Sequence, residues 1–264
     1  MRNHLMNLVR ISSLVVLLGA FHVSCDSEGT RFTGPHPVVH ESPSGIYFGQ
    51  FTTTIGANPV AVNVTGIVSE QGDMQLVFPI DAQRHYAGMV QVDGTSLSAA
   101  LTEYRGSVGR FMGTSDLDTA TLDGTVSTAD SLAGTYTGAL DEGLFVLDYL
   151  PSYEVASSLD LTVGVWTFDM AAAGGGVYTV TWDIDANGVI FGTDTDGCVF
   201  DGNISLIDAR YNAYRITVDV TLCGAINGEY SGLAYLEAVG RPDLNWMTVS
   251  VSNPVFAFAA ILQK

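Results

Sequence analysis

The sequence predicts an all-β protein made of two tandem antiparallel meanders, each closing into an eight-stranded small β-barrel or a strongly curled sheet. Three observations favour this class. Apolar and polar residues alternate in short runs rich in β-branched and aromatic residues. Turn residues end these runs about every 10 to 14 positions, which is the spacing of a meander. The two halves of the chain also repeat the same order of strands and turns.

Single runs show the alternation clearly. Residues 60–68 form one such run, and residues 214–220 form another. A third run, residues 178–185, is followed by Ala186-Asn187-Gly188 and a further apolar run. Asn-Gly between two alternating runs is a strong hairpin signal. No long amphipathic helix is expected after residue 25.

The repeat begins with a glycine and an aromatic strand in each half. The first half opens on Gly45-Ile46-Tyr47-Phe48 and the second on Gly164-Val165-Trp166. Each half holds about eight short strands, and closing such a meander into a barrel removes its two exposed edges. One larger barrel shared by both halves is an alternative, and an outer-membrane barrel is another.

These patterns divide the chain into five parts. Residues 1–25 form a signal peptide, 26–44 a flexible tether, 45–150 the first barrel-like domain, 151–162 a linker and 163–264 the second barrel-like domain. The tether is rich in Pro, Gly and Ser and shows no hydrophobic period. About 19 residues of flexible chain span roughly 25 Å on average.

The first 25 residues predict export. Arg2 and Arg10 precede the apolar run 11–21, which is shorter than the about 20 residues of a membrane-spanning helix. The run ends in Val23-Ser24-Cys25, and this end resembles the lipobox of bacterial lipoproteins, although His22 stands where leucine is usual. The resemblance implies that Cys25 becomes a lipidated N-terminus carrying palmitate-type acyl chains. Ordinary signal cleavage, giving a soluble secreted or periplasmic β protein, is the alternative.

The cysteine count agrees with a lipidated Cys25. The other two cysteines are Cys198 and Cys223, and an oxidising compartment allows them to form a disulfide. Two buried free thiols are the alternative. A zinc site is disfavoured because these cysteines lack the short spacing of zinc ligands.

The charge excludes several partners. The chain has 10 basic and 28 acidic residues, a net charge of −18. Arg2 and Arg10 precede Cys25 and every acidic residue follows it, so the mature chain carries about −20. Nucleic acid and anionic lipid both need a basic surface and are not expected as partners. A salty habitat, where repulsion is screened, is a further hypothesis.

Two short motifs suggest relatives. Gly164-Val165-Trp166 resembles the first strand of lipocalin-like and avidin-like barrels. The run 197–202, with Cys223 after the next strand, resembles exported bacterial lipoproteins of unassigned function. These resemblances imply a barrel and imply nothing about a ligand.

One acidic run matches the start of a calcium loop. Asp183, Asp185 and Asn187 place oxygen ligands at positions 1, 3 and 5, and Gly188 stands at position 6. Position 12 would be Asp194, where a glutamate is usual. The alternative is a hairpin turn whose carboxylates face water.

Aromatic residues of the second half are candidates for a ligand cup. Trp166, Trp182, Tyr178 and Tyr214 would line it in a lipocalin-like barrel. Small eight-stranded barrels are alternatively filled by their own side chains.

No spacing singles out a catalytic set or a cofactor. His36 and His40 lie in the tether, and His85 begins a strand without an assigned acidic partner. We therefore expect no enzyme. The expected protein is a lipoprotein of the bacterial cell envelope, at the outer membrane or cell surface, that acts as a binding or structural module for an unknown protein. A carrier of a small apolar ligand is the alternative.

Overall fold

The structure of the protein is a computed structural model that describes residues 41–54, 59–78, 84–108, 111–112, 118–171, 177–237 and 246–264. The predicted signal peptide, Cys25, His36 and His40 lie outside these residues. Nearly all described elements are strands, and the helical ones are short 3-10 turns. Within the described ranges, no helix is both long and apolar enough to cross a membrane.

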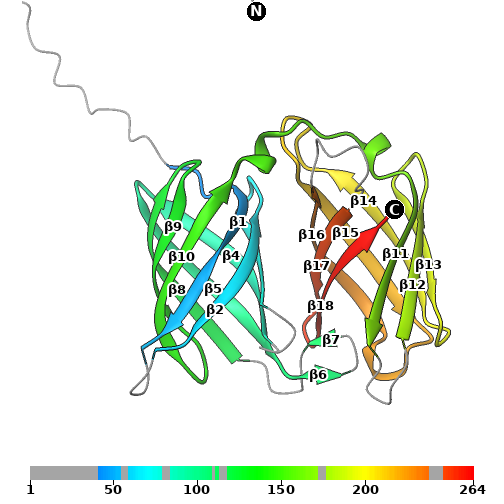
Figure 1. Ribbon diagram of the computed structural model, residues 1–264, viewed down its shortest axis with the longest axis horizontal. Coiled ribbons are helices and arrows are strands. Elements are labelled where there is room, and N and C mark those ends of the chain that lie inside the picture. The colour runs from blue at the N-terminus through cyan, green and yellow to red at the C-terminus, as the bar shows by residue number, and fades with distance from the viewer. Residues whose placement is uncertain are drawn as a thin grey trace, which may run out of the picture. The chain divides into compact units, whose positions relative to one another are not determined.

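The first barrel is a closed eight-stranded antiparallel meander (Figure 1). Its strand order is β1-β10-β9-β8-β5-β4-β3-β2. The strands are β1 (Gly45–Thr53), β2 (Ala61–Val68), β3 (Asp73–Val77), β4 (Arg84–Asp93), β5 (Ser96–Arg105), β8 (Asp118–Ser127), β9 (Ser131–Thr137) and β10 (Glu142–Leu150).

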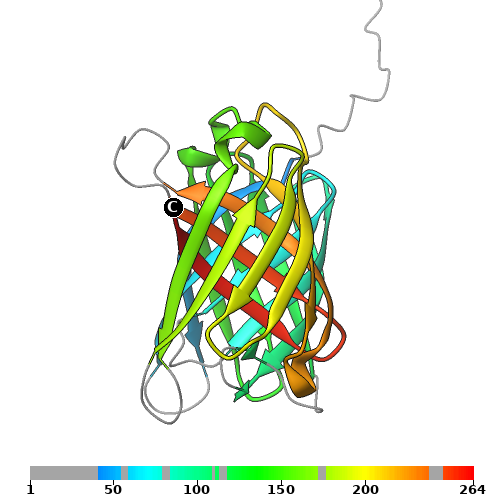
Figure 2. The same cartoon turned by 90° about the vertical axis from the view of Figure 1, so that its right-hand side faces the viewer.

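The second barrel repeats the meander and faces the viewer in Figure 2. Its first and last strands meet at Thr167 and Gln263. The strands are β11 (Gly164–Ala171), β12 (Val177–Ile184), β13 (Val189–Asp194), β14 (Val199–Leu206), β15 (Tyr214–Thr221), β16 (Gly228–Glu237), β17 (Trp246–Ser252) and β18 (Ala257–Gln263). The predicted all-β class with two eight-stranded meanders is confirmed, and the alternative of one shared barrel is wrong.

Two short strands depart from the simple meander. β6 (Ser107–Val108) and β7 (Phe111–Met112) lie between β5 and β8 in the chain and pair with each other. β7 also pairs with β18 of the second barrel, at Met112 and Ala257. The first barrel therefore extends a hairpin onto the second.

The two barrels are joined by a segment with two 3-10 turns, η2 (Pro151–Glu154) and η3 (Leu159–Leu161). Leu159 packs against the core of the second barrel. Tyr214 donates a hydrogen bond from its hydroxyl to the Ser158 carbonyl at 3.1 Å. The linker thus fixes itself to the barrel that follows it.

The repeat extends to an individual contact. In the first barrel the Tyr47 hydroxyl donates to the Pro43 carbonyl at 2.9 Å. In the second, Trp166 Nε1 donates to the Thr162 carbonyl at 2.6 Å. Both aromatic rings are buried inside their barrels, so each first strand is tied to the backbone four residues upstream.

Strand alternation explains how the interiors are filled. Successive side chains point to opposite faces of a strand, and the inward positions carry large apolar residues. In the first barrel the Phe51 ring lies between 4.8 and 6.0 Å from four other aromatic rings. These four are Phe78, Tyr86, Tyr136 and Phe145. The second barrel buries Trp166, Trp182, Phe200, Tyr214 and Tyr230.

Candidate functional site

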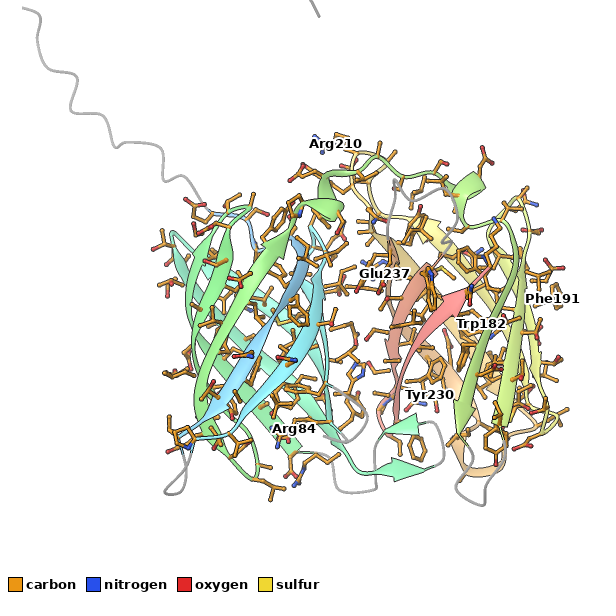
Figure 3. All side chains as sticks on the ribbon, viewed as in Figure 1. Arg84, Trp182, Phe191, Arg210, Tyr230 and Glu237 are labelled. Carbon is orange, nitrogen blue, oxygen red and sulfur yellow. A yellow bond between two sulfur atoms is a disulfide. The ribbon has the colours of Figure 1, made fainter. Side chains whose placement is uncertain are left out.

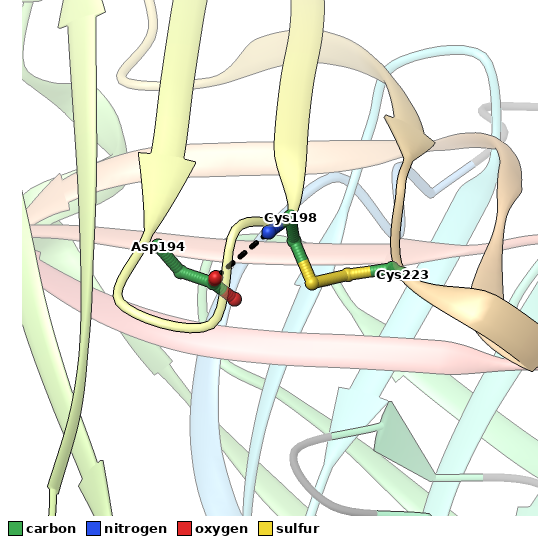
Figure 4. A group of neighbouring side chains, drawn as sticks. All are labelled: Asp194, Cys198 and Cys223. Atoms are coloured by element: carbon green, nitrogen blue, oxygen red, sulfur yellow. Dashed lines mark hydrogen bonds between the residues drawn. A yellow bond between two sulfur atoms is a disulfide. The ribbon is translucent and has the colours of Figure 1, made fainter.

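Cys198 and Cys223 form a disulfide in the second barrel (Figure 4), as the cysteine count predicts. Their Cα atoms are 4.9 Å apart. Asp194 lies beside them and accepts hydrogen bonds through Oδ1 from the backbone N–H of Cys198 at 2.9 Å and of Asp196 at 2.8 Å. Disulfide sulfurs are not thiolates, which are the form of cysteine that binds metals. This group therefore stabilises a loop and does not offer a metal its ligands.

The predicted calcium turn is a hairpin turn between β12 and β13. Asp185 Oδ1 accepts hydrogen bonds from the N–H groups of Asn187 at 2.8 Å and Val189 at 2.9 Å. These backbone bonds lower the pKa of Asp185, chiefly through Val189. Gly188 has a positive φ of 80°, which glycine adopts at no steric cost. The carboxylate of Asp185 thus serves the turn itself.

Asp194 does not reach this turn, so the predicted four-ligand set is wrong. Across the hairpin Asp183 pairs with Phe191, whereas Asp194 pairs with Val180. Phe191 and Asp194 are three positions apart on β13, a distance of about 10 Å. Calcium ligands lie about 2.3–2.6 Å from the ion, and one ion cannot span that gap.

The predicted ligand cup of the second barrel is filled by its own side chains. Trp166, Trp182 and Tyr214 are at most 1% exposed and belong to the core, while Tyr178 is partly exposed. Trp182 lies within the barrel in Figure 3. A cavity beside Trp182, Phe200 and Tyr230 has a volume of about 10 Å³, which is room for about one water molecule. The packing favours the filled barrel over the cup.

Glycine 192 contributes to this packing. A Cβ atom at Gly192 would collide with the Trp182 ring. The absence of a side chain there leaves room for the Trp182 indole beside β13. The core thus depends on a small residue as well as on large ones.

One end of the first barrel holds an ionic cluster around the buried Glu103, and Arg84 belongs to it (Figure 3). Glu103 is 0% exposed. Its Oε1 lies 3.4 Å from Arg84 Nε and 3.7 Å from Arg105 Nε, and its Oε2 accepts from the Ala139 N–H at 2.9 Å. Arg84 Nη1 also donates to both oxygens of Asp141 at 3.1 Å. Arg105 is in turn paired with Asp118.

This cluster shifts the ionisation of its neighbours. Burial, with added negative charge from Asp141, raises the pKa of Tyr136 to about 12. Burial also raises the pKa of Tyr86. For Arg84, burial alone would lower the pKa, but Tyr86, Asp141 and Glu103 outweigh it and raise the pKa. The cluster is a set of paired charges that closes this end of the barrel.

The two barrels pack against each other through outward-facing side chains. Ile46 and Ile67 of the first barrel contact Leu233 and Tyr235 of the second, and Tyr153 of the linker joins them. Every one of these residues is at most 4% exposed. β17 is buried on both faces over most of its length, because one face lines its own barrel and the other meets the first barrel.

A polar contact at the centre of this interface is also buried. Gln75 Oε1 lies 2.7 Å from His85 Nε2 and accepts from the Ser250 hydroxyl at 3.2 Å. A carbonyl oxygen only accepts, so Nε2 of His85 must carry the proton. His85 is 0% exposed, and burial lowers its pKa to about 3. The histidine is therefore neutral and holds the barrels in register.

A polar groove opens beside this contact, with a volume of about 220 Å³. We call it the inter-barrel groove. Strands of both barrels line it, and none of its residues belongs to an undescribed segment. The lining residues are Asp73, Gln75, Ala87, Gly88, Met89, Tyr104, Arg215, Ser231, Gly232 and Ser252.

A second hollow of about 360 Å³ lies elsewhere between the barrels. Phe48, Leu150 and Tyr235 give it an apolar lining, and Glu237, labelled in Figure 3, adds a carboxylate. Glu237 accepts a short hydrogen bond from the Thr248 hydroxyl. The inter-barrel groove offers more polar groups and is the better candidate binding site.

The outer face of the second barrel carries a row of carboxylates. Asp219 lies directly opposite Asp201 on one side and Glu229 on the other. Phe191, opposite Asp201, is 66% exposed on the same face (Figure 3). Like charges directly opposite each other destabilise a sheet. This row therefore places three carboxylates of the acidic chain side by side on adjacent strands.

Comparisons with protein-family models, with curated proteins and with solved structures find no match. Sequence reasoning missed the inter-barrel groove, because its residues come from six strands of two barrels.

Proposed function

We propose that the protein is a lipoprotein of the bacterial cell envelope, anchored through Cys25, whose two-barrel body is a binding module. The flexible tether 26–44 would hold this body away from the membrane. The ligand would bind in the groove between the barrels and not inside either barrel.

The packing of the barrels supports a binding module more than a carrier. The described core of the second barrel leaves a cavity of only about 10 Å³ beside Trp182, whereas the inter-barrel groove measures about 220 Å³. A concave site with a few convergent polar groups is the usual form of a ligand site. The position of this groove between two packed barrels is the observation that carries the proposal.

Mass spectrometry of the full-length protein from native membranes tests the anchor. We expect a mature mass that begins at Cys25, includes acyl chains and is two hydrogens short because of the Cys198–Cys223 bond. Cys25→Ala should abolish the acyl mass, whereas His22→Leu, a matched change in the same signal, should keep it. A mature mass without acyl chains in the unaltered protein would refute the anchor.

A further inference from the structure

Resting on the proposed binding function, we infer that the inter-barrel groove binds a neutral, hydroxyl-rich ligand of the size of one sugar ring. The ligand would be the terminal unit of a saccharide or a free monosaccharide. Four properties of the groove favour such a ligand: its size, its unused hydrogen-bonding groups, its charge and its apolar side.

The size of the groove limits the ligand. A volume of about 220 Å³ is smaller than the about 300–1,000 Å³ typical of sites for drug-sized molecules. The groove therefore accepts a single ring with its substituents. Because exposed residues such as Met89 and Ser231 line the groove, a longer chain attached to that ring could continue into solvent.

Unused hydrogen-bonding groups point to a polar ligand. Gln75 is 6% exposed, and its amide oxygen is taken by His85 and Ser250. Its amide nitrogen has no partner among the described residues, although it can donate two hydrogen bonds. Leaving the donors of a buried amide without a partner costs free energy. The Gln75 amide nitrogen therefore needs an acceptor, which a ligand or water in the groove can supply.

An ion pair beside Gln75 adds both donors and acceptors. Arg215 Nη2 donates to Asp73 Oδ2 at 2.7 Å. In the described part of the chain, Arg215 Nε and Nη1 and Asp73 Oδ1 have no hydrogen-bond partner. The Ser231 hydroxyl likewise has none there. The groove thus offers donors next to an acceptor.

Hydroxyl groups match this arrangement. Each hydroxyl donates one hydrogen bond and accepts others, so two neighbouring hydroxyls can donate to a carboxylate and accept from a guanidinium. Sites built to hydrogen-bond hydroxyls discriminate strongly against ligands that lack them. A hydrocarbon ligand would leave the amide and the ion pair unsatisfied.

The charge of the groove favours a neutral ligand over an ion. Asp73 and Arg215 neutralise each other at 2.7 Å. An anion would meet the negative potential of a chain with a net charge of −18. A cation would have to compete with Arg215 for Asp73.

The groove also has an apolar side. Met89 is 48% exposed, while Ala87 and Tyr104, which also line the groove, are buried. Tyr104 is fixed because its hydroxyl donates to the Asn253 carbonyl at 2.7 Å. The C–H face of a sugar ring would lie against these residues.

Ligand-detected saturation-transfer NMR on the purified full-length protein in detergent tests this inference. The probes are glucose, galactose, mannose and N-acetylglucosamine, with glucuronate and glucosamine as charged counterparts. We expect at least one neutral sugar to bind in the millimolar range and the charged counterparts to bind more weakly.

Two pairs of variants locate the binding. Arg215→Gln should weaken it about tenfold or more because a hydrogen bond to a charged group is lost. Arg210→Gln is its control, because Arg210 also pairs with an aspartate, Asp208 at 2.6 Å, but does not line the groove. Ser231→Trp should fill the groove and abolish binding, whereas Thr193→Trp places the same side chain at another exposed position of the barrel. Melting temperatures of all four variants confirm folding.

Three results would overturn the inference. These are no binding of any neutral sugar at tens of millimolar, stronger binding of a charged counterpart, and equal effects of Arg215→Gln and Arg210→Gln. The anchor is judged separately by the mass of the protein. A protein that carries acyl chains and binds no sugar refutes the sugar site alone, and one that binds sugar without acyl chains refutes the anchor alone.

Discussion

The disulfide of the second barrel should contribute measurably to stability. Cys198 and Cys223 are 25 residues apart in the chain. For a loop of this length, the chain-entropy model gives a loss of about 12 cal/mol/K in the unfolded state, or about 3.5 kcal/mol at 25 °C. The double variant Cys198→Ala, Cys223→Ala should therefore unfold with a free energy lower by that amount. Alanine avoids a new buried hydroxyl at Cys198, which is 6% exposed.

The shift in melting temperature depends on how many residues unfold together. If the second barrel of about 100 residues unfolds alone, its entropy of unfolding is about 0.2 kcal/mol/K and the melting temperature falls by about 16 °C. If both barrels unfold as one unit of about 220 residues, the fall is about 8 °C. The buried contact of Gln75, His85 and Ser250 joins the barrels, so we expect the smaller fall in a single transition.

Differential scanning calorimetry and urea unfolding without reductant measure both quantities. Chemical reduction of the unaltered protein is the control, because it breaks the bond and keeps both side chains. A loss below about 1 kcal/mol would refute the entropic reasoning. Two separate transitions would refute the coupling of the barrels.

Three further predictions concern ionisable groups. The lowered pKa of His85, about 3 against 6.5 for a free histidine, means that the unfolded chain binds one proton more between these values. The contribution of His85 to the free energy of unfolding is therefore fully present above about pH 6.5, and it should fall by about 1.4 kcal/mol per pH unit as the pH drops towards 3. The variant His85→Gln should remove this slope in urea titrations. An unchanged slope would contradict the assignment. Glu103→Ala should cost about 2–3 kcal/mol because the partly buried Arg84 and Arg105 lose a charged hydrogen-bonding partner. Glu103→Gln, which keeps an acceptor for the Ala139 N–H, should cost less. Equal losses in urea unfolding would show that the charge is unimportant. Asp219→Asn should raise the free energy of unfolding by about 0.5–1 kcal/mol by removing two like-charge contacts. Added NaCl should raise the melting temperature of the unaltered protein more than that of the variant. A melting temperature insensitive to NaCl would count against repulsion between these carboxylates.

Local patterns in the sequence were sufficient for the strands and turns. The hairpin at Asn187-Gly188 was predictable because its turn needs a residue with positive φ between two alternating runs. The glycine and aromatic residue that open each half pointed to the repeat. These features depend on neighbours in sequence, which is the information that a single chain provides.

Features that join distant strands were not predictable from the sequence. Alternation separates inward from outward positions but does not show which outward face meets another barrel. Ile67 and Phe191 are both outward apolar residues, yet Ile67 is 2% exposed in the interface and Phe191 is 66% exposed. Likewise, Asp194 matches a calcium loop by spacing, and only the strand register shows that it lies at the far end of the hairpin.

Because of the hairpin of β6 and β7, the two barrels differ in how completely their own strands pair. The first barrel closes with its own eight strands. In the second, β18 is paired along one edge with β17, while its other edge is shared between β11 at Gln263 and the borrowed strand β7 at Ala257. Cutting the chain at the linker would deprive β18 of that cover and leave part of its edge open to pair with another molecule. In strand pairing the first barrel is thus complete by itself, while the second is completed by its neighbour.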